Sequence, residues 1–226
     1  MPSIVLPIKE LIRICREEGV DQVFVDGAHS IGNLDIDMQD IKADFYTSNL
    51  HKWFFCPASV AFLYCRRSLL PNLHHPVFSS EYGNGLAMES AWIGNRDYSS
   101  QLCVPVVVEF VKQFEGGVEG IRKKNHDSVV RMGEMLAKAW DTHLGAPPEL
   151  CSAMAMVGLP DSLKISSEKD AIDLRTRLRK DFGVEVPIYH RPQIAKTDFD
   201  VTDCPKAAFS AYARISNQIY NTVDDY

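Results

Sequence analysis

VDGAHSIG (residues 25–32) and the beginning of SNLHKW (residues 48–53) lie in the 23–52 stretch that decides the fold. In the first segment an apolar run ends in an acid, Asp26, and a turn of small residues follows at once. In the second segment another short run leads directly to Lys52. In proteins of alternating strands and helices, ligands bind at the carboxyl ends of the strands. We therefore expect Asp26 and Lys52 to face one site.

This lysine and this acid are the two groups that pyridoxal phosphate requires. The amine of Lys52 would form a Schiff base with the aldehyde of the cofactor, and the aromatic residues 53–55 predict partial burial of that amine. The carboxylate of Asp26 would keep the pyridine nitrogen protonated, so that the ring accepts the electrons of a substrate carbanion. His29 is placed to contact the ring or its phenolic oxygen. Taken singly, each motif is typical of a cap or a solvated turn; together they predict a cofactor site.

Several segments, in this order, resemble the class V aminotransferase family of pyridoxal-phosphate enzymes, particularly its cysteine desulfhydrase-like and isopenicillin N epimerase-like branch. The segments are DGAH at 26–29, HKW at 51–53, WIGNRD at 92–97, RIS at 214–216 and YN at 220–221. The resemblance covers essentially the whole chain but only the latter part of the family's usual length. It therefore implies a chain truncated at the front, where the family's phosphate cradle begins, and slightly at the end, inside a closing helix.

The resemblance also implies roles for further residues. In the family, the segment like WIGNRD reaches the cofactor phosphate of the neighbouring subunit through a threonine, and here Asn95 holds that position. An amide can also donate a hydrogen bond to phosphate; the alternative is a dimer-interface turn without cofactor contact. Arg214 resembles the residue that binds the substrate carboxylate, which a guanidinium matches with two parallel hydrogen bonds. The phosphate would be served by a polar group beside the lysine: His51, Ser48 and Asn49, with Thr47 next to them.

Composition bounds the class of protein. The 226 residues make one large domain or two small ones, and 46% hydrophobic residues suffice for a sizeable core. A net charge of −6 argues against a nucleic-acid or membrane-surface partner. No apolar run approaches the roughly 20 residues of a membrane span, and the start does not resemble a signal peptide, so we expect a cytoplasmic protein. The six cysteines form no CxxC pair, which favours free thiols over a disulfide framework or a zinc site.

The periodicity of apolar residues predicts an α/β fold. Helices are expected at 7–18, 118–144 and 169–182 and from 217 onward, with a short helix within 31–42. Strands are expected at 20–26, 45–48, 60–65, 154–159, 184–189 and 207–215. The strand at 20–26 is apolar enough for burial on both faces. The strands at 45–48 and 60–65 are expected to be antiparallel neighbours, because the loop between them is too short for a crossover helix.

With the resemblance, these elements predict the C-terminal part of a fold-type-I pyridoxal-phosphate transferase. We expect a mixed, mostly parallel sheet with flanking helices, followed by a small C-terminal α/β domain. The expected bounds are 1–115 for the remaining part of the cofactor-binding domain, 116–145 for a long connecting helix, and 146–226 for the small domain.

Three hypotheses on function follow. The first is a homodimeric enzyme acting on a small amino acid, as a lyase such as a cysteine desulfhydrase, an epimerase or a transferase, in which Lys52 also moves the α-proton. The second is a catalytically incomplete family member that pairs with a full-length partner. The third is an α/β binding module with a coincidental lysine. Cys204 lies where cysteine desulfurases carry a reactive cysteine, but its setting, FDVTDCPK, does not match their motif, so persulfide chemistry is not expected.

Overall fold

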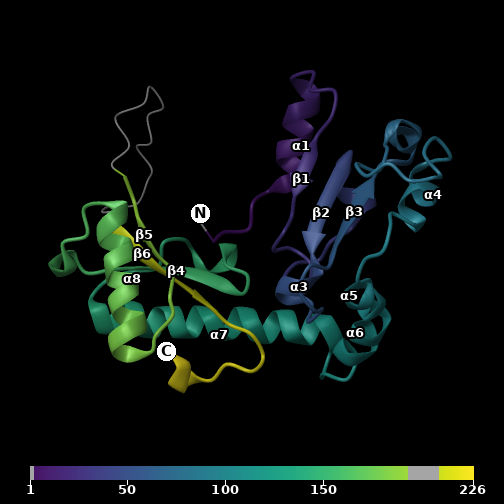
Figure 1. Cartoon of the computed structure of the whole chain (residues 1–226). Coiled ribbons are helices and arrows are strands. Elements are labelled where there is room, and N and C mark those ends of the chain that lie inside the picture. The colour runs from purple at the N-terminus through teal and green to yellow at the C-terminus, as the bar shows by residue number, and fades with distance from the viewer. Residues whose placement is uncertain (1–2, 193–208) are drawn as a thin grey trace. The chain divides into compact units, whose positions relative to one another are not determined.

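The computed structural model describes residues 3–192 and 209–226, and the chain divides into two compact units (Figure 1). One unit is the continuous segment Pro7–Gly120, and the other combines Met1–Leu6 with Ile121–Tyr226. The boundary falls inside helix α7 (Gly117–Trp140), which confirms the long helix expected from the sequence. The predicted domain bounds, with this helix as a separate connecting element, stay a prediction.

The Pro7–Gly120 unit contains a three-stranded mixed sheet in the order β1-β2-β3. Its strands are β1 (Phe24–Asp26), β2 (Phe45–Asn49) and β3 (Ala61–Cys65). Strands β1 and β2 are parallel, and β2 and β3 are antiparallel, which confirms the predicted hairpin-like pairing. The expected mostly parallel sheet is wrong for the described residues, because β1–β2 is their one parallel strand pair and three other pairs are antiparallel.

One face of this sheet is covered by α1 (Ile8–Glu17) and α2 (Met38–Ile41). The core between them contains Ile12, Val25, Ile41, Ala43 and Tyr46. The strand predicted at 20–26 is shorter than expected and is buried on one face only. Phe24 is 58% exposed and Leu63 is 52% exposed, because no described residue covers the second face of the sheet at these positions.

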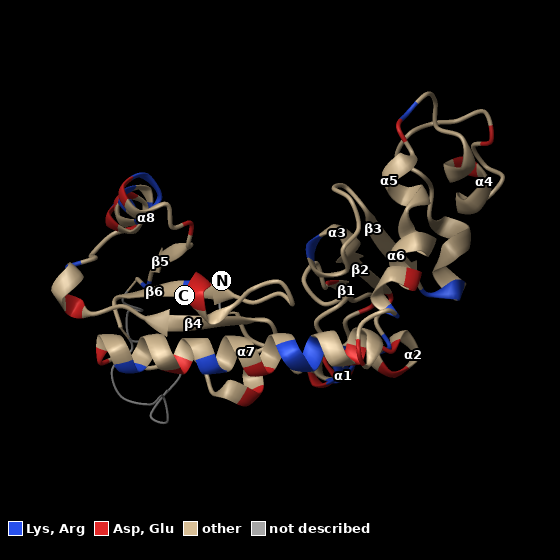
Figure 2. Ribbon diagram, turned by 90° about the horizontal axis from the view of Figure 1, so that it is seen from below, with Lys and Arg blue, Asp and Glu red and all other residues tan. Residues whose placement is uncertain are grey.

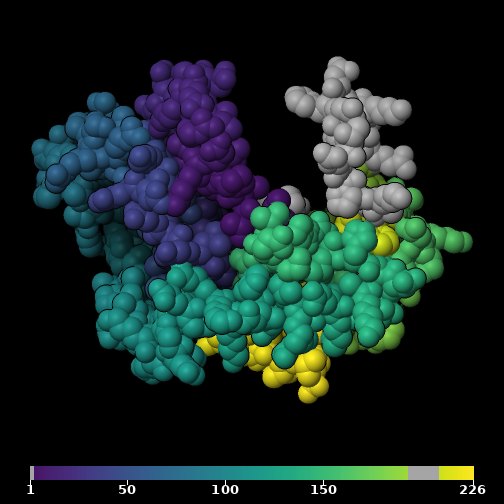
Figure 3. Space-filling model, turned by 180° about the vertical axis from the view of Figure 1, so that it is seen from behind, coloured from purple at the N-terminus to yellow at the C-terminus, as the bar shows by residue number. Residues whose placement is uncertain are grey.

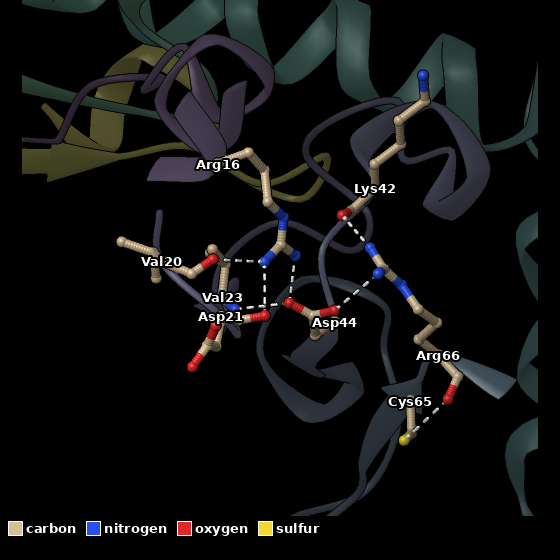
Figure 4. Close-up of polar contacts among 8 residues, drawn as sticks. All are labelled: Arg16, Val20, Asp21, Val23, Lys42, Asp44, Cys65 and Arg66. Atoms are coloured by element: carbon tan, nitrogen blue, oxygen red, sulfur yellow. Dashed lines mark hydrogen bonds and ion pairs between the residues drawn. The ribbon is translucent and has the colours of Figure 1, made fainter. Parts of the chain in front are cut away.

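Asp44, directly before β2, joins three segments of this unit (Figure 4). Its carboxylate is buried and pairs with the guanidinium groups of Arg16 from α1 and Arg66 from the end of β3. It also accepts the Val23 backbone N–H at 2.7 Å. Burial raises the pKa of Asp44, but the two ion pairs and the backbone N–H outweigh it and hold the pKa below its usual value. The carboxylate thus holds α1 and both outer strands to β2.

The rest of the unit consists of short helices and loops after β3. They are the 3₁₀ helix η1 (Arg67–Asn72), α4 (Leu86–Ala91), α5 (Ser99–Leu102) and α6 (Val104–Val111). Phe55, which follows the lysine segment, packs its ring against Phe110 and Phe114, with centroids 5.6 and 6.2 Å away. These ring contacts attach the lysine segment to the α6 region.

The loop from 73 to 89 is organised around a second buried carboxylate, Glu89. It accepts hydrogen bonds from the His74 ring at 2.8 Å and from the backbone N–H groups of His75 and Gly83 at 2.9 Å each. These donors hold the pKa of Glu89 at about 2. The adjacent histidines therefore serve the loop structure.

The Glu89 contacts predict an acid-sensitive loop. The pKa of Glu89 falls from 4.5 to about 2 on folding, so its stabilising contribution is complete above pH 4.5 and is lost as the pH falls toward 2. We expect amide hydrogen exchange at His75 and Gly83 to accelerate over this range, and Glu89→Gln to accelerate it already at neutral pH. Equal exchange in the variant and the natural chain at pH 6 would contradict this role of the carboxylate.

The second unit is built on an antiparallel sheet in the order β4-β6-β5. Its strands are β4 (Met154–Gly158), β5 (Ile188–His190) and β6 (Ala211–Ser216). Two hydrophobic clusters pack α7 and α8 (Glu168–Phe182) against these strands. Figure 2 shows that α7 and α8 carry acidic and basic residues along their length, while the strands are largely uncharged. Strand β4 and helix α8 match the predictions at 154–159 and 169–182, whereas the strand predicted at 184–189 is observed only at Ile188–His190. Of the strand predicted at 207–215, residues 207 and 208 lie outside the described residues, and β6 begins at Ala211.

The helix predicted from Asn217 onward is wrong. Asn217 and Gln218 are buried, and their side-chain amides bond to Asn125 of α7 at 3.4 and 2.8 Å. These bonds hold the segment out of helical geometry, and only a 3₁₀ turn, η4 (Val223–Asp225), follows. In the space-filling view this terminal segment lies against α7 (Figure 3).

Candidate active site

The site begins where the parallel strands β1 and β2 end. Asp26 is the last residue of β1 and lies opposite Thr47 of β2. Its side chain is exposed, and one carboxylate oxygen accepts the Ala28 backbone N–H at 3.0 Å, which fixes the carboxylate at the start of the turn. The position at the carboxyl edge of the strands is the one expected from the sequence.

The turn from 27 to 33 is fastened to β2 by hydroxyl groups. The Tyr46 hydroxyl donates to Ser30 Oγ at 2.6 Å, and Ser30 Oγ donates to the Gly27 carbonyl at 2.6 Å. Ser48 Oγ accepts the Ile31 backbone N–H at 3.1 Å. Burial raises the pKa of Tyr46 and keeps its hydroxyl a donor. The turn therefore has one defined position beside β2.

Two further contacts set the position of His29 in this turn. Asn33 Nδ2 donates to the His29 carbonyl at 2.8 Å. Gly32, at a φ of +84°, comes so close to α3 (Leu50–Trp53) that a Cβ there would lie 2.5 Å from the Trp53 carbonyl oxygen. The turn can approach Trp53 this closely because residue 32 has no side chain.

Lys52 lies in α3, which follows β2 without a loop. Its Nζ is 3.3 Å from His29 Nε2, and the Trp53 indole donates to His29 Nδ1 at 3.0 Å. The structure therefore brings the amine and the imidazole together beside the strand edge that carries Asp26. The expected partial burial of Lys52 is wrong, because its side chain is exposed in the part of the chain that the structure describes.

The predicted phosphate residues differ in their environments. Ser48 is fully buried, and its hydroxyl contacts Ser30 Oγ and Ile31 N inside the unit, so it does not face the strand edge. His51 Nδ1–H donates to the Val60 carbonyl at 2.9 Å, which leaves its Nε2 available. Asn49, at the end of β2, is half-buried. Of these residues, His51 and Asn49 are the better placed for a phosphate.

The remaining predicted site residues lie outside this cluster. Asn95 is exposed in the loop between α4 and α5. Arg214 belongs to the other unit: it lies on β6 opposite Met156, and its guanidinium carbon is 5.6 Å from the centroid of the Tyr189 ring. It also borders an open, mainly apolar cavity of about 750 Å³ near α7 and α8. Cys204 lies outside the described residues.

The residue types at this edge fit pyridoxal phosphate: an exposed amine suits its aldehyde, an exposed carboxylate suits its ring nitrogen, and an imidazole contacts the amine. The sequence analysis missed the indole contact to His29. Its signal was present in the HKW segment, because a tryptophan directly after the lysine brings an N–H donor to the same turn of helix.

Other kinds of site receive no support from the described residues. Within 3–192 and 209–226 no cluster of His, Cys, Asp or Glu could hold a metal ion. None of the helices in these ranges has the length and apolar character needed to cross a membrane. The described cysteines are free thiols: Cys15, Cys56, Cys65, Cys103 and Cys151.

Comparison with known proteins agrees with the family predicted from the motifs. A model of the class V aminotransferase family matches residues 3–99. The fold resembles the apo cysteine desulfurase from Thermococcus onnurineus NA1, with a TM-score of 0.67, 17% identity, and coverage of 99% of this chain and 54% of that chain. The chain belongs to the class V aminotransferase family, whose members use pyridoxal phosphate.

Within the family the chain is similar to L-cysteine desulfhydrases. It is 60% identical, over its whole length, to a probable chloroplastic L-cysteine desulfhydrase of Arabidopsis thaliana, of which it covers 46%. It is 30% identical to isopenicillin N epimerase of Streptomyces clavuligerus, over 84% of this chain and 50% of that protein. The chain thus spans about half the length of these curated relatives. The expected cytoplasmic location stays a prediction.

Proposed function

We propose that this chain carries the cofactor lysine of a pyridoxal-phosphate enzyme that acts on a small amino acid, with the desulfhydration of L-cysteine as its reaction. The observation that carries the proposal is the convergence of Asp26, His29 and Lys52 at the carboxyl edge of β1 and β2. Because the amine of Lys52 is exposed, a carbonyl group can reach it, and the neutral form of the amine is the nucleophile. The substrate assignment rests on the relatives named L-cysteine desulfhydrase.

Each residue has a chemical task in this proposal. Lys52 binds the cofactor and, when substrate replaces it, takes the proton from the α-carbon. Asp26 holds a proton on the ring nitrogen, and His29 supplies a hydrogen-bond donor beside Lys52. When bound, pyridoxal phosphate takes up the electron pair left at the α-carbon. Arg214 binds the substrate carboxylate through its planar fork.

We further propose that the working protein is a homodimer. A closed two-fold dimer is the commonest assembly of soluble proteins. In such a dimer Asn95 of one copy would donate its amide N–H to the cofactor phosphate of the other, a task its exposed position permits. His51 and Asn49 would contact the phosphate within each copy.

An absorbance spectrum tests the central claim. We expect the purified chain, mixed with pyridoxal phosphate and desalted, to retain a visible absorbance band that Lys52→Ala abolishes. Borohydride reduction before digestion should then leave the added mass on the peptide that contains Lys52. The matched control is Lys123→Ala, which removes an exposed lysine of α7 with a side chain 77% accessible and should keep the band.

Two outcomes would contradict the proposal. If the natural chain and Lys52→Ala give the same spectrum, Lys52 is not the cofactor lysine of this chain. The alternative, a catalytically incomplete family member that pairs with a full-length partner, would then be favoured. If Lys123→Ala also loses the band, the loss in Lys52→Ala is not specific to that lysine and does not identify the cofactor site.

A further inference from the structure

His29 lies between two nitrogen groups of α3. On one side the Trp53 Nε1–H points at His29 Nδ1 with a separation of 3.0 Å. On the other side Lys52 Nζ is 3.3 Å from His29 Nε2. Tryptophan and lysine are consecutive, so one helical turn contacts both ring nitrogens.

The chemistry of these groups selects one form of the imidazole. An indole N–H can only donate, so His29 Nδ1 must present a lone pair. A neutral imidazole with a lone pair on Nδ1 carries its hydrogen on Nε2. The Nε2–H group then points at Lys52. In a hydrogen bond with this group the amine must accept, which only its neutral form can do, because an ammonium group has only donors.

We propose that Trp53 is a positioning residue that fixes His29 as the Nε2–H tautomer and thereby presents an N–H donor to the nucleophilic nitrogen of Lys52. The tautomer is argued from the Trp53 and Lys52 contacts of this chain and does not involve the cofactor. Its meaning for the attack of Lys52 on a carbonyl rests on the proposed function.

The surrounding backbone sets the position of His29 beside α3. Asn33 Nδ2 holds the His29 carbonyl, and the close approach of Gly32 to the Trp53 carbonyl fixes the distance between turn and helix. Of the charged groups, Lys52 contacts the ring, and Asp26 lies three residues before His29 in the sequence. The Asp26 carboxylate accepts the Ala28 N–H, so it is directed to the backbone of the turn.

Nuclear magnetic resonance of the chain without cofactor tests the proposal. In a sample with ¹⁵N-labelled histidine, the long-range proton–nitrogen correlations distinguish the two neutral tautomers and the cation. We expect His29 to show the Nε2–H pattern at neutral pH, its signals being assigned by their loss in His29→Gln. In Trp53→Phe, which keeps an aromatic ring but removes the donor, we expect that single pattern to be lost in favour of a mixture of tautomers.

A matched control is Trp92→Phe, the same exchange at a tryptophan that is 58% exposed and belongs to α4's C-terminal end. It should leave the His29 pattern unchanged. An Nδ1–H pattern in the natural chain would overturn the proposal, and this measurement holds even if Trp53→Phe does not fold. An unchanged Nε2–H pattern in a folded Trp53→Phe variant would overturn it as well.

This test is separate from that of the proposed function. A chain that shows the Nε2–H tautomer but takes up no pyridoxal phosphate at Lys52 would contradict the function and support the role of Trp53. A chain that binds the cofactor at Lys52 but shows the Nδ1–H tautomer would do the opposite.

Discussion

Asp44→Asn should lower the free energy of unfolding of the Pro7–Gly120 unit by about 3–5 kcal/mol, the usual cost of removing one partner of a buried ion pair. The substitution keeps the shape of the side chain but leaves Arg16 and Arg66 without their shared carboxylate. Since domains are stable by about 5–15 kcal/mol, this is a large fraction of the total. Urea unfolding would measure it in a Trp140→Phe background, where the remaining tryptophans, Trp53 and Trp92, both report on this unit.

The control is an aspartate in an exposed ion pair of the same unit. Asp40 pairs with Lys9, and their side chains are 54% and 63% accessible, so Asp40→Asn should cost below about 1 kcal/mol. The pH dependence has a defined sign. The pKa of Asp44 is lowered on folding, so its contribution is present above the unfolded pKa and is lost as the pH falls below it. If both variants lose the same free energy of unfolding, the burial of Asp44 does not make its ion pairs more stabilising than an exposed pair.

Gly32→Ala should lower the stability of the same unit by about 2–6 kcal/mol and separate His29 from Trp53. Two costs add. A non-glycine residue at a φ of +84° is strained by about 1–3 kcal/mol. The new Cβ would also lie 2.5 Å from the Trp53 carbonyl oxygen, and overpacking of this kind costs about 1–3 kcal/mol. The measurements are urea unfolding and the hydrogen exchange of the Trp53 indole N–H.

Gly19→Ala separates these two costs. Gly19 has a φ of +79°, but a Cβ there would meet no atom within 4 Å. Its replacement should therefore cost only the backbone strain of about 1–2 kcal/mol and leave the indole exchange unchanged. If both variants lose the same stability, the close approach of the turn to Trp53 is not tight in solution.

The parts of the site that sequence predicts well are local. Asp26 ends β1 and Lys52 lies in the short helix that follows β2, so recognising the two strands was enough to place both near one edge. The antiparallel pairing of β2 and β3 was equally accessible, because the loop between them is short. Ser48 was interpreted as a phosphate contact, although the period of two in a strand places it on the same side as the buried Tyr46.

The predictions are wrong where residues distant in the sequence determine the exposure of a side chain or the conformation of a segment. The exposure of Phe24 and Lys52 depends on which segments cover the sheet. An apolar run predicts a strand, but it does not show which segments pack on the two faces of that strand. The segment after Ser216 has a composition that permits a helix. Its amides bond instead to Asn125, more than 90 positions earlier, and no local pattern reveals such a partner.

The interrupted chain path of the second unit affects how this polypeptide folds as it is synthesised. Pro7–Gly120 is one continuous stretch, so all of its native contacts are available once Gly120 has left the ribosome. The other unit needs residues from both sides of this stretch: the Val5 N–H donates to the Leu150 carbonyl at 2.8 Å. The Val5 N–H therefore lacks this hydrogen-bond partner until Leu150 has left the ribosome. The Pro7–Gly120 unit, which follows Val5 in the chain, can fold before that point. The residues translated just before the Pro7–Gly120 unit thus reach these native contacts only after that unit has been made.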